Sequence, residues 1–566
     1  MAKVAKPAAP DHLTMTLFAP GMTAMHRAGL GGLACTLQAM KRQHELDLLD
    51  PNTLPGPVAA DGVYPWDITD DSVTLRFGKS TRARDYLEKL FAFSFSITPS
   101  GLIYLPGQHR SQPSDAVLAA LHSGFTLTFL QHGQVRALAK DETSVSYDFA
   151  GDGVPSLVLK YRKCSRFKHQ SGWKELVGTD GSLVAGTIAV DGPISPGTVI
   201  RHVAFARHTR AENPPDRMLP LYFAMVGCLP LPVNRGVAAL IVPDVDDLLA
   251  YVYDRPAMTP TTPMECQIAN AADGAFRAQV SLRKNSRTEA EIRRRAQQSM
   301  RGSAVPACYT MTFQPTAWAK QQKSRVETIH VPSGNDAVLD RYQLALLHLA
   351  PRIGSRTTRE STGRGKRKTT TERVESFRAD SIVRPLIAKN LALGLKWYHG
   401  FVTLMTKKDP ATKEPYRDRL HFETKGLHAM IAETRMWDEA GEQLVVDAVH
   451  QAMRRRMAQI RSETDGDTSK GLSQATKNRW ERFRERLRLS LCGAKKEDDV
   501  RFALVDLFSR AGTIPALRGN WQPVLPVIRQ DWQLARDLGL LALASYAGKG
   551  DAATADQPEP TTLSEE

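Results

Sequence analysis

Residues 351–374, with the sequence PRIGSRTTRESTGRGKRKTTTERV, divide the 566-residue chain into two parts with different patterns. This segment has eight basic residues, two acids and almost no apolar side chains, so it predicts a basic flexible loop with no core of its own. Before it, strand-like stretches alternate with helical windows; after it, only helical patterns follow. We therefore predict an α+β protein, with a mixed α/β N-terminal region followed by an all-α C-terminal helical bundle.

These patterns predict five segments along the chain. They are an α/β region over 1–350, the basic flexible loop over 351–375, a helical connector over 376–435, a helical bundle over 436–550 and a disordered acidic tail over 551–566. The helices expected in the bundle cover 442–461, 473–491, 500–510 and 524–545. The last of these contains Pro526, which predicts an early break in that helix.

A long helix is predicted over 24–45, because Thr23 can cap it and apolar residues recur along one side. Gly29, Gly31 and Gly32 lie inside this helix, where each costs roughly 1 kcal/mol of helix stability relative to Ala. Their spacing resembles a dinucleotide-binding fingerprint, but that motif needs its glycines at a strand-to-helix turn. Close packing of another segment is therefore the preferred interpretation, and a partner interface is the alternative.

No pattern in the chain predicts a complete catalytic site. Asp244, Asp246 and Asp247 follow a strand-like stretch and would suit a two-metal nuclease. The structural interpretation, which we prefer, is that Asp246 caps the following helix while Asp244 begins a turn. Six cysteines are scattered without a Cys-x-x-Cys pair or a short Cys/His cluster, so no zinc site is predicted. We expect no catalysis, no metal and no cofactor.

The charge of the chain indicates its class of partner. There are 75 Lys and Arg against 60 Asp and Glu, a net charge of +15, which favours binding to polyanions. The apolar runs are far shorter than the roughly 20 residues of a membrane-spanning helix. Residues 1–10 have no apolar stretch typical of a secretory signal. We therefore expect a cytoplasmic protein that binds nucleic acid and no membrane.

The basic residues occur in bursts that predict contacts with nucleic acid. Residues 160–169 hold five cations with Tyr161 and Phe167 between them, an alternation that would place charge on one strand face and leave rings for base stacking. Further bursts occur over 201–210, in the basic loop, and on the outer face of the helix over 473–491. The predicted contact residues are Lys160, Arg162, Lys163, Arg166, Lys168, Arg201, Arg207, Arg210, Arg364, Lys366, Arg367, Lys368, Arg479, Arg482 and Arg486.

Residues 18–33, FAPGMTAMHRAGLGGL, resemble the start of the CRISPR-associated large subunit of the Myxan branch of type I Cascade complexes. The chain length, the α/β first part, the basic middle and the helical end agree with this family. The resemblance implies a subunit beside the one that holds the 5′ handle of the guide RNA, in contact with backbone and small subunits. It implies recognition of the protospacer-adjacent motif in target double-stranded DNA, stabilisation of the displaced single strand, and recruitment of the helicase–nuclease. Sequence reading is then left to guide RNA pairing.

Two other functions stay open from the residues alone. One is a metal-dependent nuclease that uses the three aspartates over 244–247. The other is a stand-alone DNA-binding transcriptional regulator, although no persuasive recognition helix of a helix-turn-helix is present.

Overall fold

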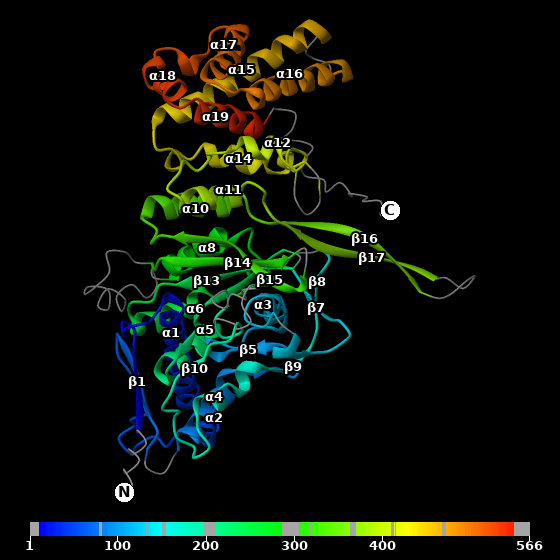
Figure 1. Cartoon of the computed structure of the whole chain (residues 1–566). Coiled ribbons are helices and arrows are strands. Elements are labelled where there is room, and N and C mark those ends of the chain that lie inside the picture. The colour runs from blue at the N-terminus through cyan, green and yellow to red at the C-terminus, as the bar shows by residue number, and fades with distance from the viewer. Residues whose placement is uncertain are drawn as a thin grey trace. The chain divides into compact units, whose positions relative to one another are not determined.

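The structure is a computed structural model that describes most of the chain. The described residues are 11–78, 82–131, 133–149, 154–196, 211–234, 236–285, 305–316, 319–362, 369–408, 413, 415–466 and 471–547. The chain forms two units, whose elements Figure 1 shows: unit 1 is Met1–Asn335 with Thr357–Phe377, and unit 2 is Asp336–Arg356 with Arg378–Glu566. Unit 1 mixes helices and strands and the C-terminal region is helical, which confirms the predicted α+β class.

The helix α1 (Ala24–Glu45) has the predicted bounds, and Thr23 caps it through its side chain. It packs against α5 (Pro215–Gly227), and a Cβ atom added to Gly29 or Gly32 would lie well inside 3.0 Å of the α5 backbone. A Cβ on Gly31 would meet the ring of Tyr251 equally closely. The glycines therefore permit close packing inside unit 1, and the packing interpretation is confirmed.

The strands form sheets of two to four members. The spatial orders are β1–β3–β2, β12–β13–β14–β15 and β16–β17–β8–β7, with the pairs β4–β5, β6–β9 and β10–β11. Their bounds are β1 (His12–Thr16), β2 (Trp66–Ile68), β3 (Ser72–Arg76), β4 (Ser96–Ile97), β5 (Ile103–Tyr104), β6 (Arg136–Leu138), β7 (Thr143–Tyr147), β8 (Leu157–Tyr161), β9 (Cys164–Phe167), β10 (Ile188–Ala189), β11 (Glu212–Asn213), β12 (Leu229–Asn234), β13 (Val237–Pro243), β14 (Cys308–Thr316), β15 (Ala319–Val331), β16 (Arg352–Thr362) and β17 (Thr369–Ala379).

Helices cover these sheets and build the core of unit 1. Besides α1 and α5 they are α2 (Ala83–Ser94), α3 (Asp115–Leu127), α4 (Trp173–Leu176), α6 (Leu248–Met258), α7 (Pro263–Cys266) and α8 (Ala271–Asn285). Leu118 of α3 is fully buried, and Leu159 and Tyr161 of β8 pack against its cluster. Because side chains alternate along a strand, this contact fixes which face of β8 points to solvent.

The predicted basic loop over 351–375 is a β-hairpin over most of its length, so the prediction of a loop is wrong for the strands β16 and β17. β17 also pairs in parallel with β8, where Ser376 faces Leu157, and the Ser376 hydroxyl donates a hydrogen bond to the Pro155 carbonyl. Threonine-rich segments favour strands when a partner strand is present. β16 and β17 lie next to each other in this sheet and close in the sequence, whereas β8 lies far away in the sequence.

Unit 2 is helical on both sides of the hairpin. Its helices are α10 (Asp336–His348), α11 (Arg384–Ala392), α12 (Val402–Thr406), α13 (Arg417–Leu420), α14 (Thr424–Ile431), α15 (Ala440–Asp465), α16 (Gln474–Gly493), α17 (Glu497–Ala511), α18 (Trp521–Gln530) and α19 (Trp532–Ser545). The predicted bundle helices are present. The break in the last one lies at Asp531 and not at Pro526, because the Asp531 carboxylate caps α19 by accepting from the backbone N–H groups of Gln533 and Leu534 at 2.9 and 3.2 Å.

Candidate nucleic-acid interface

Lys160 is held on the solvent face of β8. It lies opposite Ser144 of β7 in the antiparallel register, and both side chains are exposed. Its neighbours Leu159 and Tyr161 point the other way, into the cluster under α3. Packing of the alternate residues therefore turns the Lys160 ammonium group toward solvent.

Three more predicted cations follow on the connection from β8 into β9. Arg162, Lys163 and Arg166 are exposed, and within the described part of the chain no ion pair is recorded for them or for Lys160. The backbone N–H of Ala139 donates to the Lys163 carbonyl at 2.8 Å, which brings the exposed Lys140 beside this group. We call these five residues the β8–β9 cationic surface: Lys140, Lys160, Arg162, Lys163 and Arg166.

The sequence did not single out Lys140, because it lies beyond β6 and reaches this surface only through the pairing of β6 with β9. No local charge pattern marks it: the next two residues are the acids Asp141 and Glu142. Only the strand pairing, which is a long-range property, could have found it.

Lys168 differs from the other predicted cations of this segment, because it is paired inside unit 1. Its ammonium nitrogen lies 2.6 Å from an Asp191 carboxylate oxygen and 3.2 Å from one of Glu175. Burial lowers the pKa of Lys168, but the hydrogen bond to Asp191 and the two nearby carboxylates outweigh it and raise the pKa overall. Its charge is thus neutralised locally.

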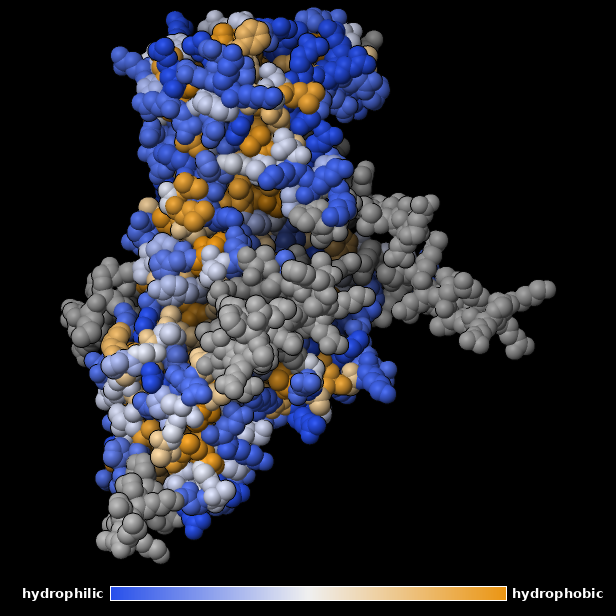
Figure 2. Space-filling view, in the orientation of Figure 1, coloured by the Kyte–Doolittle hydropathy of each residue, from blue (hydrophilic) through white to orange (hydrophobic). Residues whose placement is uncertain are grey.

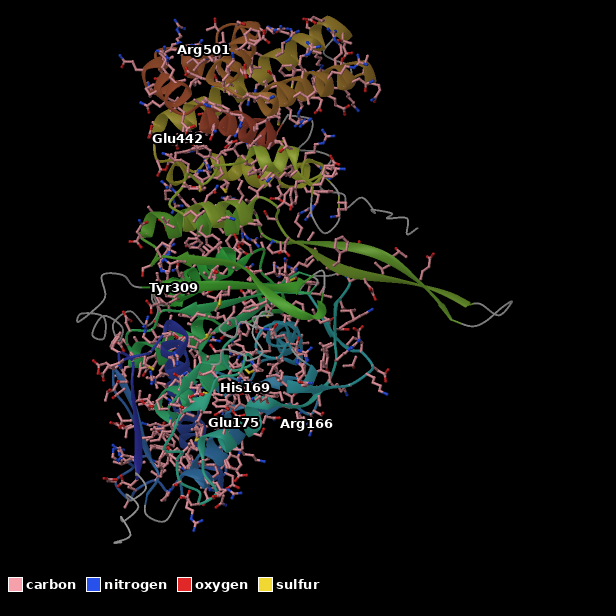
Figure 3. The ribbon with its side chains drawn as sticks, viewed as in Figure 1. Arg166, His169, Glu175, Tyr309, Glu442 and Arg501 are labelled. Atoms are coloured by element: carbon pink, nitrogen blue, oxygen red, sulfur yellow. The ribbon has the colours of Figure 1, made fainter. Side chains whose placement is uncertain are left out.

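The aromatic rings of this segment pack inside unit 1 and are not available for stacking on bases. Phe167 is 3% exposed and packs edge-on against Phe95, while Tyr161 packs against His122. His169 is fully buried, neither ring nitrogen has a recorded partner in the described residues, and burial lowers its pKa to about 3. His169 is thus buried whereas Arg166 is exposed, and both are labelled in Figure 3. The expectation that these rings are free to stack on bases is therefore wrong.

Two of the predicted basic groups lie outside the described residues. These are Arg201, Arg207 and Arg210, and Arg364, Lys366, Arg367 and Lys368. The second group falls between β16 and β17, and the same sheet contains β8. The fold thus joins two basic segments that are about 200 residues apart in the sequence through one sheet.

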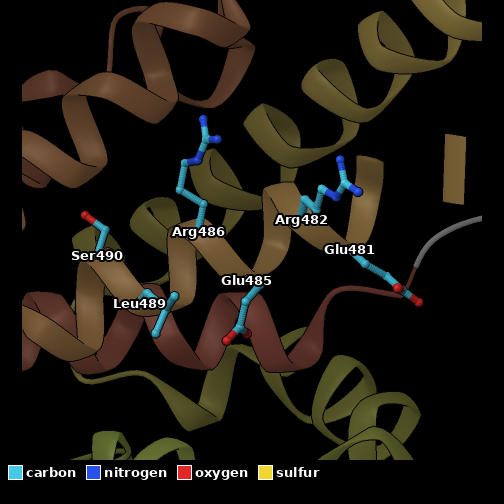
Figure 4. A pocket seen from close by; sticks show the side chains of 6 residues that line it. All are labelled: Glu481, Arg482, Glu485, Arg486, Leu489 and Ser490. Carbon is cyan, nitrogen blue, oxygen red and sulfur yellow. The ribbon is translucent and has the colours of Figure 1, made fainter. Parts of the chain in front are cut away.

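The predicted arginines of α16 fall into two kinds. Arg479 is engaged with its own bundle, since its guanidinium donates to Thr464 at 2.7 Å and to Glu463 at 3.0 Å. Arg482 and Arg486 are exposed, no partner is recorded for them among the described residues, and Figure 4 shows them projecting from the same side of the helix. Glu481 and Glu485 are close in the sequence, but Figure 4 shows the Glu485 side chain on the other side of the helix, and Glu485 is paired with Arg488.

The aspartates of the nuclease alternative have structural partners. Asp244 forms an ion pair with Arg27 of α1. Asp247 caps α6 by accepting from the backbone N–H of Ala250 at 2.9 Å, so the cap lies one residue later than predicted. Among the described residues, no group of three or more His, Cys, Asp or Glu side chains is placed to hold a metal ion. None of the helices in the described ranges is long and apolar enough to cross a membrane.

Comparisons with known proteins match both parts of the chain. Residues 14–222 match the family model of the DevT N-terminal domain, and residues 433–566 match that of the DevT C-terminal domain. The chain is 32% identical over 571 residues to the CRISPR-associated protein Cas8a1/Csx13 of Myxococcus xanthus (strain DK1622), covering 97% of this chain and 92% of that protein. The chain therefore belongs to the CRISPR-associated Cas8a1/Csx13 family, which provides the large subunit of Myxan-branch Cascade complexes.

Proposed function

We propose that this chain is the subunit through which an RNA-guided Cascade complex holds its target DNA, without catalysing a reaction itself. The observation that carries the proposal is the β8–β9 cationic surface, five exposed cations with no recorded ion pairs among the described residues. Exposed, unpaired Lys and Arg side chains contact phosphates without reading base sequence. Such contacts suit a subunit whose sequence specificity comes from the guide RNA.

The hairpin adds a second basic element to the proposal. The segment between β16 and β17, which lies outside the described residues, carries Arg364, Lys366, Arg367 and Lys368, and the two strands share a sheet with β8. We assign both segments to the phosphates of the target duplex. Arg482 and Arg486 of α16 are assigned to the displaced single strand, whereas Arg479 and Lys168 are already paired and have a secondary role at most.

Membership of the family supports the remaining roles. In this proposal the chain works in the cytoplasm together with guide RNA and with the backbone, handle-binding and small subunits. It recognises the protospacer-adjacent motif in double-stranded DNA and then recruits the helicase–nuclease. Asp244 pairs with Arg27 and Asp247 caps α6, and these structural contacts favour this account over a nuclease.

The test is binding of a labelled target duplex by the reconstituted complex with a matching guide RNA. We expect Arg162→Glu/Arg166→Glu to weaken binding at about 150 mM salt by at least tenfold, and to lower the slope of log affinity against log salt by about two. The Arg82→Glu/Lys89→Glu variant, at α2, carries the same charge change and should bind as wild type. Equal losses in both variants would mean that only net charge matters, and an unchanged Arg162→Glu/Arg166→Glu variant would remove this surface from the interface.

A further inference from the structure

Unit 2 has an exposed apolar projection on α17. Phe502 is 73% exposed, the highest value for a large apolar side chain among the described residues, and Val505 one turn later is 55% exposed. The other side of α17 is buried through Val500, Leu504 and Leu507. Because Phe502 and Val505 are largely exposed, the outer face of α17 has no apolar partner within the described chain.

A groove lies next to this projection, at the C-terminal end of the same helix. It has a volume of about 410 Å³ and lies between the second half of α17, the turn at Gly512 and the start of α18. Phe508, Ile514 and Leu517 form its buried floor. The lining is completed by Val505, Ser509, Gly512, Thr513, Arg518 and Trp521. Phe502 does not line the groove, because it points outward from the helix that forms one wall.

A projection and a groove on one surface are self-complementary. When two copies meet about a two-fold axis, residue i of one contacts residue j of the other and the reverse contact forms at the same time. Phe502 lies seven residues before Ser509, so the two are about 10 Å apart along the helix. An antiparallel pair of α17 helices therefore brings each Phe502 to the mouth of the other groove, between Val505 and Ser509.

The charges of α17 select the antiparallel arrangement. Its first turn carries Glu497, Asp498 and Asp499, and its last turn carries Arg510. Arg518 at the groove is exposed and has no recorded partner among the described residues. Antiparallel helices place acids against arginines at both ends, whereas parallel helices place acids against acids. The internal pairs Arg501–Asp498 and Arg510–Asp506 are exposed and so exchange partners at little cost.

We propose that α17 and the groove beside it form a two-fold contact with a second copy of this chain, in which each Phe502 enters the other's groove. Figure 2 shows apolar atoms among the hydrophilic surface over α17 and α18, and Figure 3 marks Arg501 on the same helix. The contact is formed by one helix and one groove per copy, which is smaller than the interfaces of stable dimers. The dimer is therefore weak and depends on protein concentration.

The first experiment measures the mass of the full-length chain by sedimentation equilibrium from about 1 to about 100 μM. The wild type should rise from 62.5 kDa toward twice that mass, and Phe502→Asp should stay monomeric throughout. Leu489→Asp is the matched control, because Leu489 is an exposed leucine on α16 of the same unit, at 55%; this variant should still dimerise. A wild type that stays monomeric at every concentration overturns the proposal. This result is expected if the groove binds the tail of its own chain or a different protein. Dimerisation of Phe502→Asp overturns it as well.

The second experiment tests the two-fold geometry by cross-linking. In a Cys492→Ser background that keeps Phe502, the double variant Asp498→Cys/Thr513→Cys is oxidised at the higher concentration, because these two positions have the same antiparallel register as Phe502 and Ser509. The two sulfurs of one chain are too far apart to join, so every new disulfide links two copies. Closed dimers are expected. A ladder of higher oligomers would indicate a head-to-tail contact, and the absence of cross-links would exclude the contact; either result overturns the proposal.

Discussion

At the scale of single residues, the packing of unit 1 depends on positions where a side chain has no room. Gly29 faces the carbonyl of Pro220, and Gly227 of α5 faces the carbonyl of Ala28 in return. The two helices thus approach each other backbone to backbone. A backbone carbonyl held inside a helix cannot move aside as a flexible side chain can, so these sites tolerate substitution poorly.

We predict that Gly29→Ala destabilises the protein by about 3 kcal/mol or more, although Ala is the better helix former. The added methyl group would overlap the Pro220 carbonyl and separate α1 from α5. Thermal unfolding followed by circular dichroism should show a loss of at least about 5 °C. Gly186→Ala is the control, since nothing lies near a Cβ at that position. A Gly29→Ala variant as stable as this control would contradict the packing described.

His169 makes stability depend on pH. Its pKa is lowered to about 3 in the folded chain, mainly by burial, against about 6.5 when unfolded. Between these values the unfolded chain binds a proton that the folded chain does not, so stability falls as the pH falls below about 6.5. Between pH 7 and pH 5, the free energy of unfolding of the His169→Phe variant should therefore fall by about 2 kcal/mol less than that of the wild type. Denaturant titrations at the two pH values measure this, with Phe129→Leu, a neighbouring ring that does not titrate, expected to keep the wild-type difference.

At the scale of elements, local sequence signals such as caps and apolar patterns predicted those helices and strands that are stabilised by contacts between residues close in the sequence. The bounds of α1 follow from its Thr23 cap and its apolar side. β17 of the hairpin also pairs with β8, and Pro155 and Ser376, which a hydrogen bond joins there, are 221 positions apart. The Asp531 cap was overlooked beside a more conspicuous proline. The cations of β8 and β9 were predicted from charge, but Lys140 and the pairing of Lys168 needed the fold.

The tip of the hairpin gives a prediction for a whole element. Replacing Arg364, Lys366, Arg367 and Lys368 by Ala removes four cations from the segment between β16 and β17. We expect the salt slope of target binding by the assembled complex to fall by up to about four, with weaker binding on matched and unmatched duplexes alike. Lys495→Ala/Lys496→Ala, before α17, controls for loss of charge elsewhere. A change confined to one DNA sequence would instead indicate base reading by the tip.

At the scale of the whole molecule, a net charge of +15 draws the chain to any polyanion, so specificity has to come from assembly. We predict that the isolated chain binds duplex DNA only weakly at about 150 mM salt, with a dissociation constant in the range of about 1–100 μM and without sequence preference. The assembled complex with a matching guide should bind far more tightly. Fluorescence anisotropy of both samples on the same duplex makes the comparison. Tight, sequence-specific binding by the isolated chain would favour a stand-alone regulator.

The order of the two units along the chain also bears on how such proteins diversify. Unit 2 begins at Asp336, but the later segment Thr357–Phe377 belongs to unit 1, so neither unit is one continuous segment. A single recombination event at any position would transfer an incomplete unit, and one that falls between β8 and β17 would also divide the strands of one sheet. Exchange of one whole unit between relatives requires three crossovers, at the boundaries after residues 335, 356 and 377. The parts of this chain are therefore expected to be inherited together, even where their surfaces change rapidly.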